Sequence, residues 1–290
     1  MSQRVALALG SGGARGYAHI GVLQVLEERG FDVCAVAGSS MGALVGGVHA
    51  AGRLKAFTDW AVALKRPDVL RLMDPKWSGA GAIGADRLIN HLNDFLTDVE
   101  IENLPIPYTA VATDLAARRE VWFQRGSLRS AIRASIAIPG VITPVTVNGR
   151  VLADGGLLNP VPIEPTAASG ADLTVAVSLQ APRPAQEPAS PVRAAAAPSW
   201  ARLRQVFTSR SAQATGVTSA PEDLRIGDVL GLSLDAMQDL IARYRMAGLP
   251  PDIHIAVPVS ASGIMDFHRA ADLIELGRTL TEKALDDAGY

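Results

Sequence analysis

The sequence predicts an α/β protein whose sheet is mainly parallel and covered by helices on both faces. An apolar run that ends at a glycine is followed by a helical pattern, and this succession occurs twice within the first fifty residues. Repeated strand-turn-helix units are typical of parallel sheets with both faces covered. The chain has 290 residues, of which 48% are hydrophobic and 19% are charged. Such a chain can bury a full core, which excludes disorder of the whole molecule.

The apolar pattern places the two N-terminal units. Residues 5–9 are expected to form a buried strand that ends in a glycine-rich turn, and 16–29 has the one-sided apolar pattern of a helix. Residues 33–37 are the second expected strand. Residues 41–51 follow as an expected helix with unusually small side chains.

The remaining elements follow from the same signals. Residues 53–100 are expected to be helices interrupted by a Pro/Gly-rich stretch at 74–84. Asn148-Gly149 between two apolar runs predicts a hairpin with a type I′ turn. The other expected elements are strands at 108–113, 121–123, 145–147, 151–153, 173–179 and 253–257, and helices at 128–136, 232–246 and 266–287.

Composition divides the chain into three parts. Residues 1–180 are expected to form the core domain. Residues 181–199 contain five prolines and seven alanines without periodicity, so 181–225 is interpreted as a flexible linker or lid-like loop. Residues 226–290 are expected to be a helix-strand-helix extension that packs on the core.

Charge, cysteine content and hydropathy exclude several classes of protein. Lys and Arg total 27 against 29 for Asp and Glu, a net charge of -2, which argues against a nucleic-acid binder. The single cysteine, Cys34, is expected to be buried and reduced. Mean hydropathy is +0.19, yet no window approaches the roughly 18 to 20 apolar residues of a membrane span, and the run at 5–9 is too short for a signal peptide. A cytoplasmic protein is expected.

A candidate nucleophile lies between the second strand and its helix. Residues 38–42, Gly-Ser-Ser-Met-Gly, match the G-x-S-x-G pattern. A serine on a sharp strand-to-helix turn exposes its hydroxyl, and the flanking glycines remove the Cβ clash. Ser40 is therefore the candidate nucleophile, whereas Ser39 is expected to be a turn or cap residue.

The glycine-rich turn at 10–16 is open to two interpretations. A dinucleotide site does not fit, because Arg15 stands where the third glycine is needed and Asp32 precedes the second strand instead of following it. A P-loop would need Gly-Lys-Ser/Thr, which is missing. Adjacent backbone N–H groups at a helix start can instead form an oxyanion hole. A plain glycine turn is the alternative.

A serine nucleophile needs a base, and a carboxyl group is the best candidate. The histidines are not at strand ends with turn chemistry and are expected to be structural or exposed: His19, His49, His91, His254 and His268. Asp154 closes the second strand of the predicted hairpin and is followed by Gly155 and Gly156. A Ser-Asp dyad is therefore the economical hypothesis.

Three motifs in this order resemble the patatin-like phospholipase family: Gly12-Gly13-Ala14-Arg15-Gly16, Gly38-Ser39-Ser40-Met41-Gly42 and Asp154-Gly155-Gly156. Segments 131–140, 159–162 and 265–268 are similar to bacterial members of its neuropathy-target-esterase-like branch. The resemblance spans roughly residues 4 to 180.

The resemblance implies a three-layer α/β/α sandwich that hydrolyses acyl esters of lipids without a metal or cofactor. Ser40 is then the nucleophile and Asp154 the base. The oxyanion hole is expected around Gly12, Gly13, Ala14 and Arg15. The further motif glycines are Gly10, Gly16, Gly38, Gly42, Gly155 and Gly156. Acyl transfer, thioester hydrolysis and a non-catalytic regulatory role on the same scaffold are the alternatives.

The expected partner is a lipid or another acyl ester. Its acyl chain needs an apolar groove near Ser40, for which the 41–48 helix, the 53–100 helices and the 181–225 segment are candidates. Six arginines against three acids give 180–225 a charge of +3, which favours contact with an anionic membrane surface at the inner face, and a solvated loop is the alternative. Arg15 is expected to cap a helix or anchor an internal carboxylate, with a lipid phosphate as its alternative partner, and Arg133 is expected to be structural. The sequence leaves the oligomeric state open.

Overall fold

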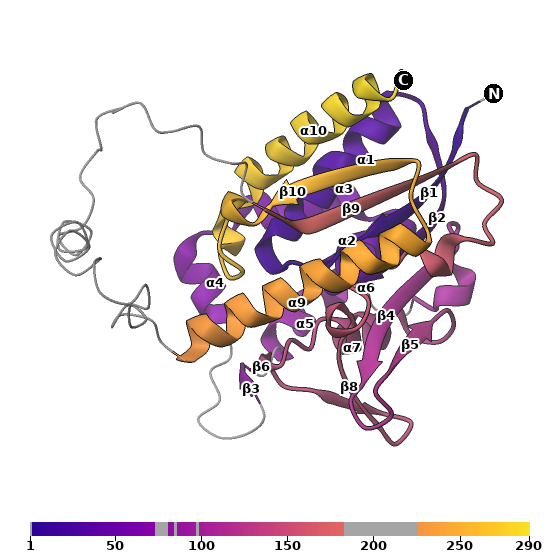
Figure 1. Cartoon of the computed structure of the whole chain (residues 1–290). Helices are drawn as coiled ribbons and strands as arrows, with labels where there is room; N and C mark the ends of the chain where they lie inside the picture. The colour runs from indigo at the N-terminus through magenta and orange to yellow at the C-terminus, as the bar shows by residue number, and fades with distance from the viewer. Residues whose placement is uncertain (1, 73–80, 84–85, 97–98, 183–225) are drawn as a thin grey trace, which may run out of the picture. The chain divides into compact units, whose positions relative to one another are not determined.

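The computed structural model describes residues 2–72, 81–83, 86–96, 99–182 and 226–290 and confirms the predicted α/β class (Figure 1). Two compact units are present, residues 1–182 together with 235–290, and residues 183–234. The described part of the second unit is the beginning of α9 (Ile226–Gly248). Positions 183–225 of the predicted linker lie outside the described residues. The candidate site lies in the first unit.

Eight of the described strands form one mixed sheet in the first unit. Its order is β10-β9-β1-β2-β4-β8-β7, with β5 paired to β4. The pairs from β10 to β4 are parallel, and β5, β8 and β7 run antiparallel to the strands they pair with. The strands are β1 (Arg4–Leu9), β2 (Asp32–Ser39), β4 (Tyr108–Asp114), β5 (Arg119–Phe123), β7 (Val145–Val147), β8 (Arg150–Asp154), β9 (Leu173–Ala181) and β10 (Ile253–Pro258), and β3 (Gly81–Ile83) pairs separately with β6 (Gly140–Ile142).

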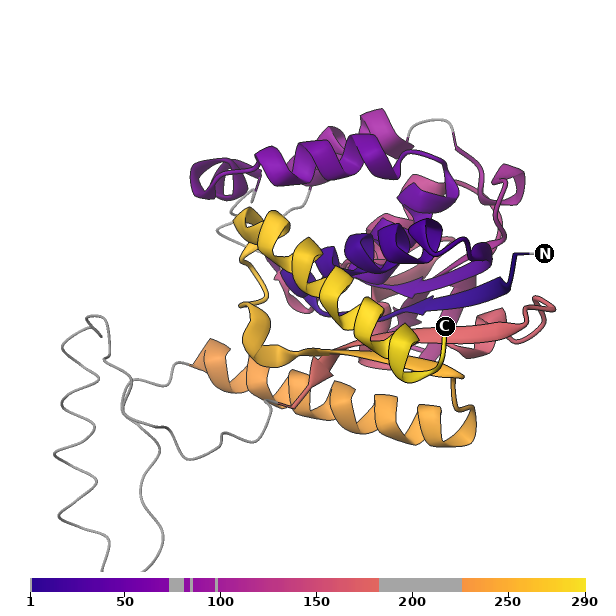
Figure 2. The same ribbon diagram turned by 90° about the horizontal axis from the view of Figure 1, so that it is seen from above.

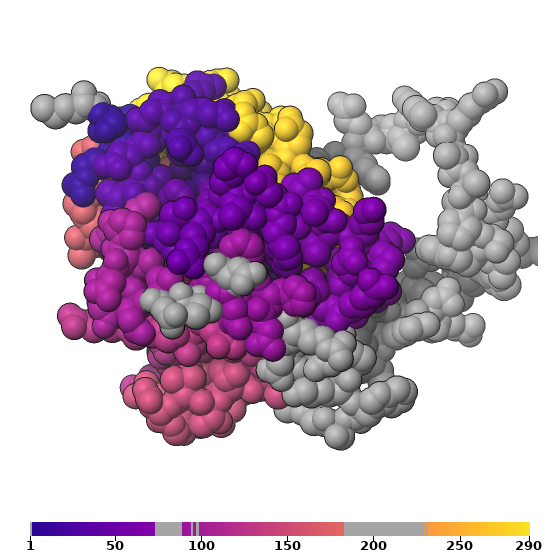
Figure 3. All heavy atoms as spheres, turned by 180° about the vertical axis from the view of Figure 1, so that it is seen from behind, coloured from indigo at the N-terminus to yellow at the C-terminus, as the bar shows by residue number. Residues whose placement is uncertain are grey.

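Helices lie on both faces of this sheet, as Figure 2 shows. One face carries α1 (Ala18–Glu28), α2 (Met41–Ala50) and α10 (Ala270–Asp287), and the part of α9 from Asp235 onward lies on the other. Seen from behind, the surface of the first face includes α3 (Leu54–Ala63) and α4 (Arg66–Leu72) (Figure 3). The other helices are α5 (Asp86–His91), α6 (Asn93–Leu96) and α7 (Leu128–Ser135), and the 3-10 turns are η1 (Gly13–Tyr17), η2 (Ile101–Asn103), η3 (Gly155–Leu157), η4 (Glu164–Thr166), η5 (Val259–Ala261) and η6 (Phe267–Arg269).

Alternation along the strands explains the two layers. Leu7 and Leu9 of β1 point into the large core beneath α1 and α2, whereas Ala8 between them packs with Ala242 of α9 on the opposite face. Successive side chains of a strand point to opposite faces. Both faces of β1 are therefore buried, as a continuous apolar run predicts.

Several local predictions can be compared with the structure. Asn148 and Gly149 both have positive φ, at 50° and 74°, and Val147 pairs with Arg150, which confirms the predicted hairpin. Cys34 is half-buried, not fully buried as expected, because β2 begins near the protein surface. The C-terminal segment contributes β10 to the main sheet. Among the described helices, none has the length and apolarity to cross a membrane.

Helices α1 and α10 approach each other so closely that glycine is needed at the crossing. A Cβ atom at Gly277 of α10 would lie 2.1 Å from the Ala18 carbonyl oxygen, and one at Gly21 of α1 would lie 2.1 Å from the Ile274 carbonyl oxygen. Both obstacles are backbone atoms, which cannot move aside as a side chain can. The helix pair therefore depends on these two glycines.

Gly277→Ala is expected to lower the free energy of unfolding by about 1–3 kcal/mol, because the added methyl group forces the helices apart. Urea denaturation followed by circular dichroism measures this. Gly248→Ala at the end of α9 is the matched control, because its Cβ would meet nothing within 4 Å, and no loss of stability is expected there. Equal midpoints for the two variants would contradict the role of Gly277.

Candidate active site

Ser40 lies on the turn between β2 and α2 in a conformation that non-glycine residues rarely adopt. Its φ is 56° and its ψ is -122°. The backbone N–H of Ser40 donates to the Ser135 hydroxyl at 2.9 Å, and that hydroxyl donates to the Val111 carbonyl at 2.6 Å. Holding a residue in this region costs on the order of 1–3 kcal/mol and requires such surrounding support. The predicted strand-to-helix serine turn is thus present in the structure.

The register of the sheet brings Asp154 to the same level as Ser40. Strand β5 pairs with one edge of β4 from Ala110 to Asp114, and along the other edge Ser39 of β2 is opposite Val111 and Asp154 of β8 is opposite Ala112. Adjacent positions along this edge of β4 therefore bring the end of β2 next to the end of β8. The two predicted dyad residues meet at one edge of β4 although they are 114 positions apart in the sequence.

The Asp154 carboxyl group is held by one oxygen only. Its Oδ1 accepts the backbone N–H of Gly156 at 2.7 Å, and its Oδ2 is buried without a hydrogen-bond partner of standard geometry among the described residues. The Ser40 hydroxyl is nevertheless close enough to lower the pKa of this carboxyl. Serine and carboxyl are adjacent without an ideal hydrogen bond, which is common in active sites that hold no substrate.

Burial dominates the electrostatics of this pair. Ser40 and Asp154 are each only 3% exposed. Burial raises the pKa of Asp154 from 3.8 to about 7, against the opposing effects of the Ser40 hydroxyl and the Gly156 N–H. A carboxyl group in a medium of low dielectric constant resists ionisation. Near neutral pH, Asp154 can therefore both hold and release a proton.

The predicted oxyanion loop follows β1 and reaches the same pocket as Ser40. Gly13 has a φ of 59° and lines the pocket together with Ser40. The N–H of Ala14 donates to the Ile264 carbonyl at 2.9 Å and is therefore occupied. No backbone acceptor for the Gly12 and Gly13 N–H groups is seen among the described residues. Gly12 and Gly13 therefore stay the candidate oxyanion donors as a prediction.

The two predicted arginines are anchored inside the protein. Arg15 is 2% exposed, and its Nε donates to the Gly12 carbonyl at 3.2 Å while its Nη2 lies 3.3 Å from Oδ1 of Asp235. This is the internal carboxylate anchor that was one of the sequence expectations. Arg133 Nη2 donates to the Thr143 carbonyl at 2.9 Å, a structural contact.

No histidine lines the described pocket. His19 Nε2 contacts the Gly10 carbonyl at 2.8 Å, and burial lowers its pKa to about 4, so the ring is neutral and donates from Nε2. His254 pairs with the Ser178 hydroxyl at 2.8 Å. Burial also lowers the pKa of His49. These three histidines are structural, as expected.

The motif glycines permit close backbone contacts around the site. A Cβ at Gly42 would lie 2.1 Å from the Leu9 carbonyl oxygen, and a Cβ at Gly155 would lie 2.1 Å from the Val111 carbonyl oxygen. These contacts fix α2 against β1 and the Asp154 turn against β4. A Cβ at any of the six motif glycines would approach a neighbour to between 2.1 and 2.6 Å: Gly10, Gly16, Gly38, Gly42, Gly155 and Gly156.

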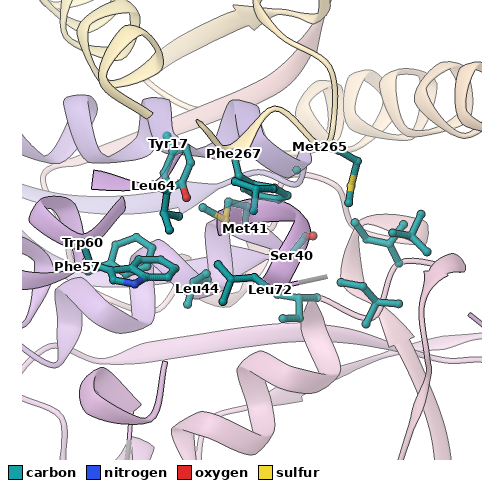
Figure 4. A pocket seen from close by; sticks show the side chains of 16 residues that line it. Tyr17, Ser40, Met41, Leu44, Phe57, Trp60, Leu64, Leu72, Met265 and Phe267 are labelled. Atoms are coloured by element: carbon teal, nitrogen blue, oxygen red, sulfur yellow. The ribbon is translucent and has the colours of Figure 1, made fainter. Parts of the chain in front are cut away.

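Ser40 opens onto an apolar pocket (Figure 4). Phe57 and Trp60 lie on one side and Met265 on the other, with Ser40 between them. Phe57 and Trp60 are stacked at a tilt, with ring centroids 5.6 Å apart. The lining residues are Gly13, Tyr17, Ser40, Met41, Leu44, Phe57, Trp60, Leu64, Val69, Leu72, Ile136, Ile138, Val141, Ile142, Met265 and Phe267.

Several site residues were not predicted from the sequence. The contribution of α2 and of the 53–100 helices to the groove was expected and is confirmed by this lining, whereas the predicted 181–225 contribution falls almost entirely outside the described residues. The sequence analysis did not predict that the Ser135 hydroxyl accepts the Ser40 N–H. It also did not predict that Met265 and Phe267 line the pocket. The similarity of segment 265–268 to the bacterial branch was the one signal that could have indicated these two pocket residues.

Fold and site together define a hydrolase-type arrangement, with a serine on a strained turn beside a buried carboxyl group at the wall of an apolar pocket. Residues 7–167 match the family model described as patatin-like phospholipase. The chain belongs to the patatin-like phospholipase family, and at the level of that family it is a lipid ester hydrolase.

Relatives of the chain carry two kinds of name. An NTE family protein of Mycobacterium tuberculosis is 45% identical over 98% of this chain and 92% of its own length. Patatin-like phospholipase domain-containing protein 6 of Homo sapiens is 35% identical over 60% of this chain and 13% of its own length. Lysophospholipase NTE1 of Cryptococcus neoformans is 32% identical over 58% of this chain and 11% of its own length.

The raised pKa of Asp154 predicts a pH-dependent stability that Asp154→Asn removes. Below about pH 4 the carboxyl is protonated in both states, and between pH 4 and 7 only the folded state keeps the proton. The free energy of unfolding of the parent should fall by about 4 kcal/mol across this interval. Asn keeps an oxygen for the Gly156 N–H, so Asp154→Asn should be the more stable protein at pH 8 and lose this slope.

Chemical denaturation at pH 4.5, 6 and 8 measures the difference. Asp59→Asn on the exposed surface of α3 is the control and should keep the slope of the parent. An Asp154→Asn protein that is less stable than the parent at pH 8 would contradict a buried carboxyl with a raised pKa.

Proposed function

We propose that the chain cleaves carboxylic esters of lipids, phospholipids or lysophospholipids, through a Ser40–Asp154 dyad and an acyl-enzyme intermediate. The observation that carries the proposal is the buried Asp154 carboxyl adjacent to the strained Ser40, at the wall of an apolar pocket. The names of the relatives, which include a lysophospholipase, support the same substrate class.

The chemistry follows from the geometry. The Ser40 oxygen attacks the ester carbonyl carbon while Oδ2 of Asp154 takes the hydroxyl proton. The oxygen of the tetrahedral intermediate, now negatively charged, accepts the N–H groups of Gly12 and Gly13, with added support from the N-terminus of α2. The proton on Asp154 passes to the leaving alcohol. Water, deprotonated by Asp154, then releases the fatty acid and restores Ser40.

The raised pKa of Asp154 makes its carboxylate a stronger base than an ordinary aspartate. An ordinary aspartate, with a pKa near 3.9, is ionised at pH 7 but a poor proton acceptor. A base is most effective when its pKa lies near the working pH. A pKa of about 7 gives Asp154 that match.

The pocket supports an acyl chain as the recognised group. All its described lining side chains are apolar except those of Ser40 and Tyr17. Each buried methylene contributes about 0.8 kcal/mol, so a long acyl chain binds better than a short one until the pocket is full.

Activity should depend on Ser40, on Asp154 and on a base that ionises near neutral pH. With a soluble p-nitrophenyl ester, Ser40→Ala is expected to abolish turnover and fluorophosphonate labelling. Asp154→Asn is expected to lower kcat by about 10²- to 10⁴-fold. Because the carboxylate is the active form, kcat/KM of the parent should rise with pH, reach half its maximum near pH 7 and level off above about pH 8.

Product analysis distinguishes ester hydrolysis from acyl transfer and thioester hydrolysis. The substrates are phospholipids, lysophospholipids, triacylglycerols and acyl-CoA. Free fatty acid released from phospholipid or lysophospholipid supports the proposal. Labelling that persists in Ser40→Ala, or acyl groups that pass to an alcohol in place of water, would contradict it.

Trp60 is expected to limit the length of the acyl chain. It lies on the far side of the pocket from Met265 (Figure 4), so Trp60→Ala opens space for additional methylenes. We expect the chain-length optimum on p-nitrophenyl esters to move up by two or more carbons, roughly the length that the indole occupied. Trp122→Ala is the matched control, since Trp122 on β5 is 44% exposed and does not line the pocket. An unchanged optimum in Trp60→Ala would reject this assignment.

A further inference from the structure

The inner face of α9 carries polar side chains that contact the glycine-rich loop after β1. Gln238 is only 7% exposed, and Asp235 one turn earlier has a side chain that is 24% exposed. Both belong to the same compact unit as the active site. Neither lines the pocket, so neither is placed to touch substrate.

The first contact holds the peptide group between Ser11 and Gly12. Gln180 Nε2 donates to the Ser11 carbonyl at 2.5 Å and to Gln238 Oε1 at 3.2 Å, and the Ser11 hydroxyl donates to the same Gln238 oxygen at 3.4 Å. In a planar trans peptide the carbonyl and the next N–H point in opposite directions. Fixing the Ser11 carbonyl toward Gln180 therefore fixes the direction of the Gly12 N–H.

The second contact holds the next peptide group in the same way. Arg15 Nε donates to the Gly12 carbonyl at 3.2 Å, and Asp235 Oδ1 lies 3.3 Å from Arg15 Nη2. The Gly12 carbonyl is thereby held on one side, and the Gly13 N–H points to the other. Two consecutive peptide groups are each held through their carbonyl by a side chain that α9 supports.

We infer that Asp235 and Gln238 are positioning residues, which orient the Gly12 and Gly13 N–H groups as oxyanion donors through Arg15 and Gln180. This inference rests on the proposed function. Glycine adopts positive and negative φ with similar ease, so a loop of consecutive glycines can rotate its peptide groups unless they are held. Oxyanion donors act only when they already point at the developing charge. The α9 contacts provide that orientation from outside the pocket.

The double variant Asp235→Ala/Gln238→Met is expected to lower kcat on a soluble ester by about 10- to 100-fold, with KM within twofold of the parent. The rate of fluorophosphonate labelling should fall in parallel, because labelling passes through a similar charged oxygen. The pH of half-maximal kcat/KM should stay near 7, since Asp154 is untouched. Each single variant should lie between the parent and the double variant.

Two further variants distinguish a positioning role of Asp235 from a purely structural one. Asp235→Glu keeps a carboxylate for Arg15 and should recover most of the kcat that Asp235→Ala loses. Met237→Gln changes a neighbouring residue of α9 that is 55% exposed and should behave as the parent. Because Asp235 is partly exposed, Asp235→Ala is expected to fold even if Gln238→Met does not, and kcat is measured well below each thermal midpoint.

The outcomes distinguish the inference from the proposed function. If Ser40→Ala is inactive while Asp235→Ala and Gln238→Met keep kcat within twofold of the parent, the inference is overturned and the proposed function stands. A lowered thermal midpoint with unchanged kcat likewise overturns it, because it marks a purely structural contact. If Ser40→Ala keeps full activity, both ideas fail together.

Discussion

The site depends on a carboxyl group that is kept away from water. Burial raises the pKa of Asp154 toward neutrality. Its Oδ1 is held by the Gly156 N–H, whereas Oδ2 has no fixed partner in the part of the chain that the structure describes. The two oxygens thereby have different tasks, since one fixes the orientation of the group and the other can exchange a proton. The same burial disfavours the ionised form and so destabilises the folded state at high pH. Under the proposed function, base strength and stability are opposed in a single residue.

A buried charge of this kind requires a tightly closed surrounding, and the structure achieves that with backbone contacts. The turn after Asp154 lies against β4 at Gly155 and against the glycine-rich loop at Gly156, where a Cβ would be 2.4 Å from the Ser11 hydroxyl oxygen. On the other side, Gly42 brings α2 against the end of β1. Three loops from distant parts of the sequence therefore meet with almost no side chain between them. This arrangement accounts for the glycines at positions 42, 155 and 156.

The parts of the fold that local patterns determine could be predicted from the sequence. Glycine spacing around Ser40 indicates a strand-to-helix turn, and Asn148-Gly149 indicates the hairpin that ends at Asp154. The meeting of these two residues depends on the register of β2 and β8 along one edge of β4, which no local pattern contains. The Ala14 N–H is occupied by the carbonyl of Ile264, a contact between positions 250 residues apart. The partner of Arg15, the Asp235 carboxylate, is likewise distant in the sequence and could not be identified from it.

In helix α9, burial does not follow the distribution of apolar residues. Two large side chains of this helix, Leu240 and Tyr244, are exposed, whereas the polar Gln238 is buried. The hydrophobic effect has no direction, so an apolar face would hold α9 against the sheet without orienting any particular group. Hydrogen bonds in a buried network depend on angle and position, and a satisfied network fixes one arrangement. Polar side chains within the inner face therefore suit a helix that is inferred to hold two peptide groups of a glycine loop in one orientation.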